Sequence, residues 1–369
     1  METTKTIRKQ RLSNIEALRI FSILLVILHH IAIHTEWSTG NSQMFVFLKY
    51  FLVLGGKVGV DLFVLISGWL MINSRPKVSS LARTVSETAV FSVVMYLVAV
   101  GMKIKNTHFD VLYFIKRIFP VMFNDYWFVT TFVLMYMTLP ILIPFLKQLN
   151  QLEYKKTLSV SFLIILIWPL LYLKPGMNFS YPVFFLFLFA VGGYIRNFVD
   201  RKSVKTSFMK AGLWALIGVF LTLSTRNLVG VQDGVIRSLM NFTGWSNAWQ
   251  ENIFIWFDAS PIPFLVAINI FLAVMNLPKF TNKIVNFFGR HVFGAYLFQS
   301  APIFSPWIYN TFIDLNGVQG TFQRLGAALI VALLLMLIGI VLHVLLGSIT
   351  TIWSKKLENV FLKFLGGLE

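Results

Sequence analysis

The run from Asn14 to His34 reads NIEALRIFSILLVILHHIAIH. It is long and apolar enough to cross a bilayer as one helix. A helix advances about 100° per residue, so one stripe collects most of its ionisable side chains: Glu16, Arg19, His30 and His34. His29 lies about 100° away from His30 and therefore off this stripe.

The stripe places ionisable groups at different depths in the membrane. With a rise of about 1.5 Å per residue, Arg19 and His30 are separated by roughly 16 Å along the axis. One group would lie near a membrane face and the other well into the hydrocarbon. Such groups usually face a protein interior or a watery cavity, because charge is expensive in lipid. Hydrogen bonding between helices and a functional site are both compatible with this pattern.

Composition limits the class of protein. The 369 residues are 57% hydrophobic and 13% charged, with 37 Phe and 10 Trp, which indicates a polytopic membrane protein. The first run lacks a small-residue cleavage site and carries charge, so it is not a cleaved signal peptide. The chain has no cysteine, which excludes disulfides, cysteine nucleophiles and thiolate metal sites, and no metal is expected. The net charge of +17 suits cytoplasmic loops beside anionic lipid, and nucleic acid is not an expected partner.

The apolar runs predict an all-α bundle of about ten transmembrane helices. The predicted spans are 15–34, 45–73, 85–102, 126–146, 157–173, 181–198, 208–224, 253–276, 286–305 and 325–349. A basic N-terminus at 1–14, a membrane domain at 15–349 and a C-terminal tail at 350–369 complete the chain. No internal repeat is apparent, which disfavours the common transporter plans.

Loop charge predicts the orientation. If the N-terminus is inside, the inside segments hold far more Lys and Arg than the outside loops. Cytoplasmic loops of membrane proteins carry this excess, so we expect both termini in the cytoplasm.

Two predicted outside loops have unusual content. Segment 103–125 contains Lys116 and Arg117 and an apolar stripe at helical spacing, which predicts an amphipathic helix on the outer face. The loop 225–252 contains Trp245 and Trp249, which would anchor it in the interface or stack on a sugar ring.

The second span contains GKVGVDLFVLISGWLM, residues 56–71. Gly55 and Gly59 form a pair that is typical of close helix packing. Lys57 and Asp61 are one turn apart, so they can neutralise each other in the membrane or serve a binding site. The polar Ser67 follows near the predicted cytoplasmic end.

Together these stretches resemble the acyltransferase-3 family, polytopic membrane acyltransferases of which many acetylate cell-surface glycans. The resemblance rests on Arg19 followed by His30, with Glu16 before them, and on the second-span pattern Gly59-Val60-Asp61-Leu62-Phe63 leading to Ser67-Gly68. Two further stretches are similar to family patterns: Asp125-Tyr126-Trp127-Phe128-Val129 and Phe293-Gly294-Ala295-Tyr296-Leu297. The chain departs from the family at Gln299, where many relatives have His, and at Tyr126, where His often stands.

The resemblance implies a role for each motif. His30 would be the general base that deprotonates an acceptor hydroxyl, since His titrates near neutral pH. Arg19 would bind the phosphates of cytoplasmic acyl-CoA, most simply acetyl-CoA, and Glu16 would orient Arg19. A pantetheine arm can span the distance between the two groups.

The remaining candidate residues would bind substrate. They are Lys57, Asp61, Ser67, Lys116, Arg117, Tyr126 and Trp127. His34 would lie at the outer end of the first span, where it would either assist the transfer or occupy the interface without taking part in chemistry. The other histidines, His29, His108, His291 and His343, are interpreted as packing or structural residues.

The first interpretation is therefore an O-acetyltransferase of a bacterial plasma membrane. It would act on an extracytoplasmic polysaccharide or its lipid-linked precursor, in association with glycan-assembly proteins. The second is a transporter or flippase for a glycan or small solute, which intramembrane charge would serve equally well. The third is a regulatory or scaffolding subunit of a glycan-assembly complex.

Overall fold

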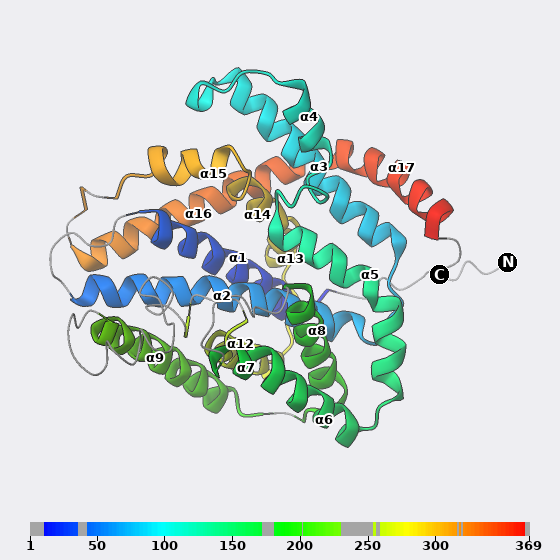
Figure 1. Cartoon of the computed structure of the whole chain (residues 1–369), viewed down its shortest axis with the longest axis vertical. Coiled ribbons are helices and arrows are strands. Elements are labelled where there is room, and N and C mark those ends of the chain that lie inside the picture. The colour runs from blue at the N-terminus through cyan, green and yellow to red at the C-terminus, as the bar shows by residue number, and fades with distance from the viewer. Residues whose placement is uncertain are drawn as a thin grey trace.

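The structure is a computed structural model. It describes residues 11–35, 43–171, 181–200, 202–229, 254–255, 259–315, 317–318 and 320–365. These residues form helices joined by turns and contain no β-strand (Figure 1). The all-α prediction is confirmed. The predicted loop 225–252, with Trp245 and Trp249, lies outside the described residues beyond residue 229.

Seven helices in the described part of the chain are long and apolar enough to cross a membrane. They are α1 (Ser13–His34), α2 (Gln43–Met71), α3 (Val78–Gly101), α5 (Trp127–Gln148), α8 (Tyr181–Phe198), α9 (Val204–Val229) and α16 (Thr321–Leu345). The apolar helix α12 (Pro261–Asn276) is shorter. The polytopic membrane bundle is thus confirmed.

The other two predicted spans are each built from several short helical segments. The first consists of α6 (Gln151–Phe162), a π-helical turn η2 (Leu163–Ile167) and α7 (Trp168–Leu171). The second consists of α13 (Lys283–His291), α14 (Phe293–Gln299) and α15 (Phe304–Trp307), followed by a π-helical turn η3 (Ile308–Phe312). Pro302 lies between α14 and α15, and a proline disfavours helical geometry in the residue before it. The count of ten crossings stays a prediction.

Helices α1 and α2 run side by side through the middle of the bundle (Figure 1). A Cβ atom on Gly59 would lie 2.4 Å from the carbonyl oxygen of Ser22, so only glycine permits this approach. On the next face of α2, a Cβ atom on Gly68 would lie 2.1 Å from the carbonyl oxygen of Phe189 in α8. The close packing predicted for the glycines of the second span is confirmed.

The start of α1 and the end of α16 lie at the same end of the bundle, because both contact α13. The Ser13 hydroxyl donates to Asn286 Oδ1 at 2.8 Å and accepts from the Asn282 backbone N–H at 2.7 Å. In α16, His343 Nδ1 lies 2.9 Å from His291 Nδ1 of α13. We call this the Arg19 end, and the opposite end, where α1 finishes at His34, the His30 end.

Two further helices lie outside the bundle core. The helix expected within 103–125 is present as α4 (Val111–Ile118), after a short turn η1 (Ile104–Asn106). Asp110 caps α4 by accepting from the Tyr113 backbone N–H at 2.7 Å. Most of the predicted tail forms α17 (Gly347–Leu365), which packs along α3 (Figure 1).

Candidate functional site

Two cavities lie along α1, one toward each end of the bundle. The histidine cavity, about 390 Å³, is lined by His29, His30, Lys57, Trp127 and Tyr181 among others. The arginine cavity, about 230 Å³, is lined by Arg19, Ser67, Ser80, Thr84 and aromatic residues. The two cavities share two lining residues, Phe63 of α2 and Phe128 of α5.

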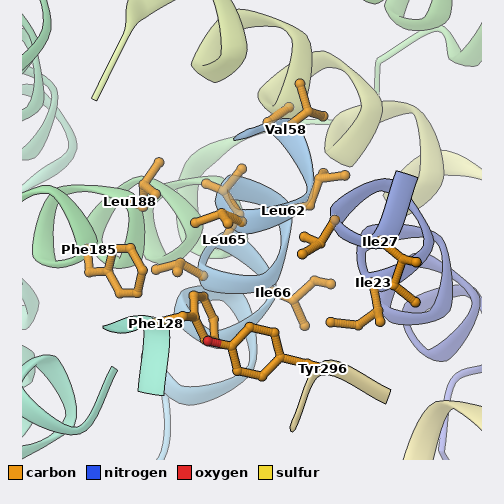
Figure 2. Close-up of a cluster of buried hydrophobic side chains, with 14 of the residues drawn as sticks. Ile23, Ile27, Val58, Leu62, Leu65, Ile66, Phe128, Phe185, Leu188 and Tyr296 are labelled. Atoms are coloured by element: carbon orange, nitrogen blue, oxygen red, sulfur yellow. The ribbon is translucent and has the colours of Figure 1, made fainter. Parts of the chain in front are cut away.

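The shared wall is a layer of aromatic rings. The Phe63 and Phe128 rings meet edge to face, with centroids 5.6 Å apart. On its other side Phe128 contacts the ring of Tyr296 at 5.4 Å. Figure 2 shows Phe128 beside Tyr296, below the aliphatic side chains of α1 and α2. Edge-to-face contacts of this kind are favourable, so they help to hold the three rings in this layer.

At the Arg19 end, one buried carboxylate holds two guanidinium groups. Arg19 Nη1 donates to Glu16 Oε1 at 3.0 Å and to Oε2 at 3.2 Å, and Arg11 Nη1 donates to Oε1 at 3.2 Å. A Cβ atom on Gly289 would lie 2.5 Å from Glu16 Cβ, so α13 covers the carboxylate closely. Two cations on one anion leave the cluster with net positive charge, which suits an anionic ligand.

At the His30 end, His30 belongs to a hydrogen-bonded group from three elements. Its Nδ1 lies 2.5 Å from Gln299 Oε1, at the end of α14. The Tyr309 hydroxyl of η3 donates to the same oxygen at 2.7 Å. The Tyr309 ring stacks on His34 with centroids 5.5 Å apart. The base candidate is therefore held by residues distant in sequence, while its ring still lines the histidine cavity.

His29 also lines the histidine cavity, but it makes a different contact. Its Nδ1 lies 2.8 Å from the Val53 carbonyl oxygen of α2. A Cβ atom on Gly56 would lie 2.3 Å from His29 Cβ, so the two helices touch at this point. His29 thus joins α1 to α2, as expected for a helix-packing residue.

The candidates of the second span lie at different places. Ser67 lines the arginine cavity beside Arg19, and its hydroxyl donates to the Phe63 carbonyl oxygen at 3.0 Å. Lys57 lines the histidine cavity beside His30. Asp61 is fully buried and lines neither cavity.

The candidates before and at the start of α5 also separate. Trp127 lines the histidine cavity, and its ring lies 4.9 Å from that of Tyr181. Tyr126 is buried and lines neither cavity.

Lys116 and Arg117 lie away from both cavities, against Asp125. Arg117 Nη1 donates to Asp125 Oδ2 at 2.6 Å, and Lys116 Nζ lies 3.7 Å from Oδ1. Burial raises the pKa of the Asp125 carboxyl, and the two cations offset part of this effect.

The structure thus brings Arg19 and Ser67 together at one cavity, and His30, Lys57 and Trp127 together at the other.

The sequence analysis noted Gln299 only as a departure from the family pattern and did not single out Tyr309. Both contact His30 from positions far along the chain, and no spacing in the sequence signals these contacts. Tyr296, in contrast, belongs to the late Phe-Gly-x-Tyr-Leu stretch and lines the histidine cavity. In the described residues, no group of three or more His, Asp or Glu side chains is arranged to hold a metal ion.

Comparison with known proteins gives one match. The model of the acyltransferase domain of the acyltransferase-3 family matches residues 12–351, nearly the whole chain. Searches of curated proteins and of solved structures give no significant match. The matched range contains α1, α2 and the residues that line both cavities. The chain therefore belongs to the acyltransferase-3 family and is a multi-pass membrane acyltransferase.

Proposed function

We propose that the protein is an O-acetyltransferase of a bacterial plasma membrane. It transfers acetyl from cytoplasmic acetyl-CoA to a hydroxyl of an extracytoplasmic polysaccharide or of its lipid-linked precursor. One observation carries this proposal: a cavity lined by Arg19 and a cavity lined by His30 meet at a wall formed by Phe63 and Phe128. Donor and acceptor can approach from opposite ends of the bundle and meet at this wall.

The arginine cavity suits the donor. Arg19 is held by Glu16 next to Arg11, and within the described residues both of its hydrogen bonds use Nη1. The Nε and Nη2 donors can bind phosphate oxygens of coenzyme A, for which a planar guanidinium is well suited. The axial distance from Arg19 to His30, roughly 16 Å, is within reach of an extended pantetheine arm.

The histidine cavity suits the acceptor. Trp127 and Tyr181 present neighbouring aromatic rings, and such rings stack on the apolar faces of sugars. His30 Nε2 takes the proton of an acceptor hydroxyl while the hydroxyl oxygen attacks the thioester carbonyl carbon. The tetrahedral intermediate then expels the coenzyme A thiolate, which takes the proton back from the His30 imidazolium, and the acetyl ester remains on the sugar.

The test is transfer of label by purified protein in lipid nanodiscs. Radiolabelled acetyl-CoA is incubated with cell-surface glycan from which ester groups have been removed by mild base. We expect labelled glycan with the unsubstituted protein and none with His30→Ala. His108→Ala is the matched control, because His108 lines neither cavity. If the unsubstituted protein labels no glycan fraction but moves glycan across the bilayer, the result supports a flippase instead.

A further inference from the structure

The contacts of His30 assign a role to Gln299, which stands where many relatives in the family have His. Gln299 is fully buried, and its side-chain oxygen lies within hydrogen-bond distance of two groups at once. His30 Nδ1 lies 2.5 Å away and the Tyr309 hydroxyl 2.7 Å away. The Gln299 amide nitrogen donates to the Ser300 hydroxyl oxygen at 2.5 Å. Every polar atom of the Gln299 side chain is thus hydrogen-bonded.

This arrangement determines where the His30 proton lies. An amide oxygen has no proton to donate, so a nitrogen that approaches it at hydrogen-bond distance must carry one. A neutral imidazole carries a proton on only one of its nitrogens. If Nδ1 carries it, Nε2 has a free lone pair, which a general base requires.

We propose that Gln299 is a positioning residue that holds His30 in the tautomer with Nδ1 protonated and Nε2 free. Tyr309 fixes the orientation of the amide, because a hydroxyl that donates to Oε1 keeps this oxygen toward His30. This inference rests on the proposed function, since it concerns the base of the transfer reaction. It gives His34 a supporting place as well, because the Tyr309 ring stacks on the His34 ring.

The orienting group is a neutral amide, whereas many enzymes use a carboxylate to orient the histidine. The other titratable groups near His30 are His29 and His34 on α1, Lys57 on α2, Tyr296 on α14 and Tyr309 on η3. No carboxylate lines the histidine cavity within the described residues. The imidazolium formed during transfer therefore has an oriented dipole beside it, and a Glu in place of Gln299 would add a negative charge there.

The first test reads the tautomer directly and needs no acyl transfer. The chain has six histidines, so protein labelled with ¹⁵N-histidine gives a small set of ring signals in solid-state NMR. The His30 signals are identified by their loss in His30→Gln. We expect protonated Nδ1 and bare Nε2 for neutral His30 in the unsubstituted protein. A mixture of tautomers is expected in Gln299→Leu. A bare Nδ1 in the unsubstituted protein, or the same signals in Gln299→Leu, would overturn the proposal.

The second test is kinetic. Gln299→Leu should lower kcat about 10- to 100-fold and leave the KM for acetyl-CoA unchanged, because positioning of the base affects chemistry and not donor binding. Gln299→Glu should restore transfer and move the acidic limb of the kcat/KM profile upward by about 1–3 pH units, because a nearby opposite charge favours imidazolium. An unshifted acidic limb in an active Gln299→Glu protein counts against the orienting contact.

Controls separate positioning from folding. Asn269→Leu removes a half-buried amide of α12, which bonds only to the Leu265 carbonyl oxygen among described residues, and should leave kcat unchanged. Tyr309→Phe and Gln299→Glu keep nearly the original volume, so they remain informative if Gln299→Leu does not fold. If the unsubstituted protein transfers no acyl group to any acceptor, the proposed function fails, whereas the NMR result still decides the tautomer.

Discussion

Phe63 meets Phe128 edge to face with ring centroids 5.6 Å apart, and these two rings line both the arginine and the histidine cavity. They come from helices that are not adjacent in sequence, α2 and α5. In the proposed function, the thioester of a donor held at Arg19 has to pass this wall to reach His30. The Phe63–Phe128 contact is therefore the narrow point of the proposed reaction path.

Enlarging one ring of this wall should slow transfer. Phe63→Trp adds volume where the two cavities meet, so we expect kcat to fall at least about tenfold because a small misplacement of the thioester is costly. The effect on kcat should exceed the effect on either KM, since Trp127, Tyr181 and Arg19 are untouched. Steady-state transfer kinetics measure both. Phe208→Trp, on an exposed face of α9, is the control and should behave like the unsubstituted protein. Unchanged kcat in a well-folded Phe63→Trp protein would place the path elsewhere.

The two adjacent histidines should differ in their importance for catalysis. His30→Ala should abolish transfer, because it removes the base. His29→Ala should retain substantial activity and lose some stability, because its ring bonds to the Val53 carbonyl oxygen and packs at Gly56. Transfer assays and thermal unfolding in detergent check this pair. Equal loss of activity in both would contradict the assignment.

The donor site should depend on the shape of the Arg19 head group. Arg19→Lys keeps the charge but replaces a planar fork with a single ammonium, so binding to phosphates and to Glu16 should weaken. We expect a rise of about tenfold or more in the KM for acetyl-CoA, with acceptor KM unchanged. Binding of coenzyme A measured by calorimetry gives an independent check. An unchanged coenzyme A affinity would show that the nucleotide binds elsewhere.

The acceptor site should be sensitive to Trp127. Trp127→Ala removes a ring that lines the histidine cavity, so the acceptor KM should rise while the KM for acetyl-CoA stays nearly the same. Lys116→Ala tests whether the segment before α5 also meets the acceptor. A higher acceptor KM in Lys116→Ala supports this. Altered stability with normal kinetics supports a structural role beside Asp125, whose Oδ1 lies 3.7 Å from Lys116 Nζ.

Both termini should be cytoplasmic. The start of α1 and the end of α16 both contact α13, which agrees with an even number of crossings between them. Because the chain has no cysteine, a single cysteine can be added at either end and probed with a membrane-impermeant thiol reagent. Met122→Cys, in the exposed turn before α5, should be labelled in intact cells, and the terminal cysteines only in opened cells. Labelling of a terminal cysteine in intact cells would reverse the assignment of donor and acceptor ends.

The class of the fold follows from composition and residue spacing alone. Long apolar runs must form helices in a membrane, because lipid offers no partner for backbone polar groups. Helical periodicity also placed Glu16 beside Arg19, and in the structure Arg19 Nη1 lies 3.0 Å from Glu16 Oε1. The same periodicity separated His29 from the stripe. These are local relationships within one helix, where geometry follows directly from residue spacing.

Tertiary packing divides the stripe between two cavities and supplies the partners of His30. The wall between the two cavities needs Phe63 and Phe128 from different helices, and the partners of His30 lie in α14 and η3. Tertiary packing also separates residues that are neighbours in sequence: Trp127 lines the histidine cavity while Tyr126 is buried outside it. Helical periodicity shows which residues of one helix share a face, but not which face of another helix packs against it. That choice depends on the packing of side chains and on close approaches such as Gly59 against Ser22, which exist only once the bundle has assembled.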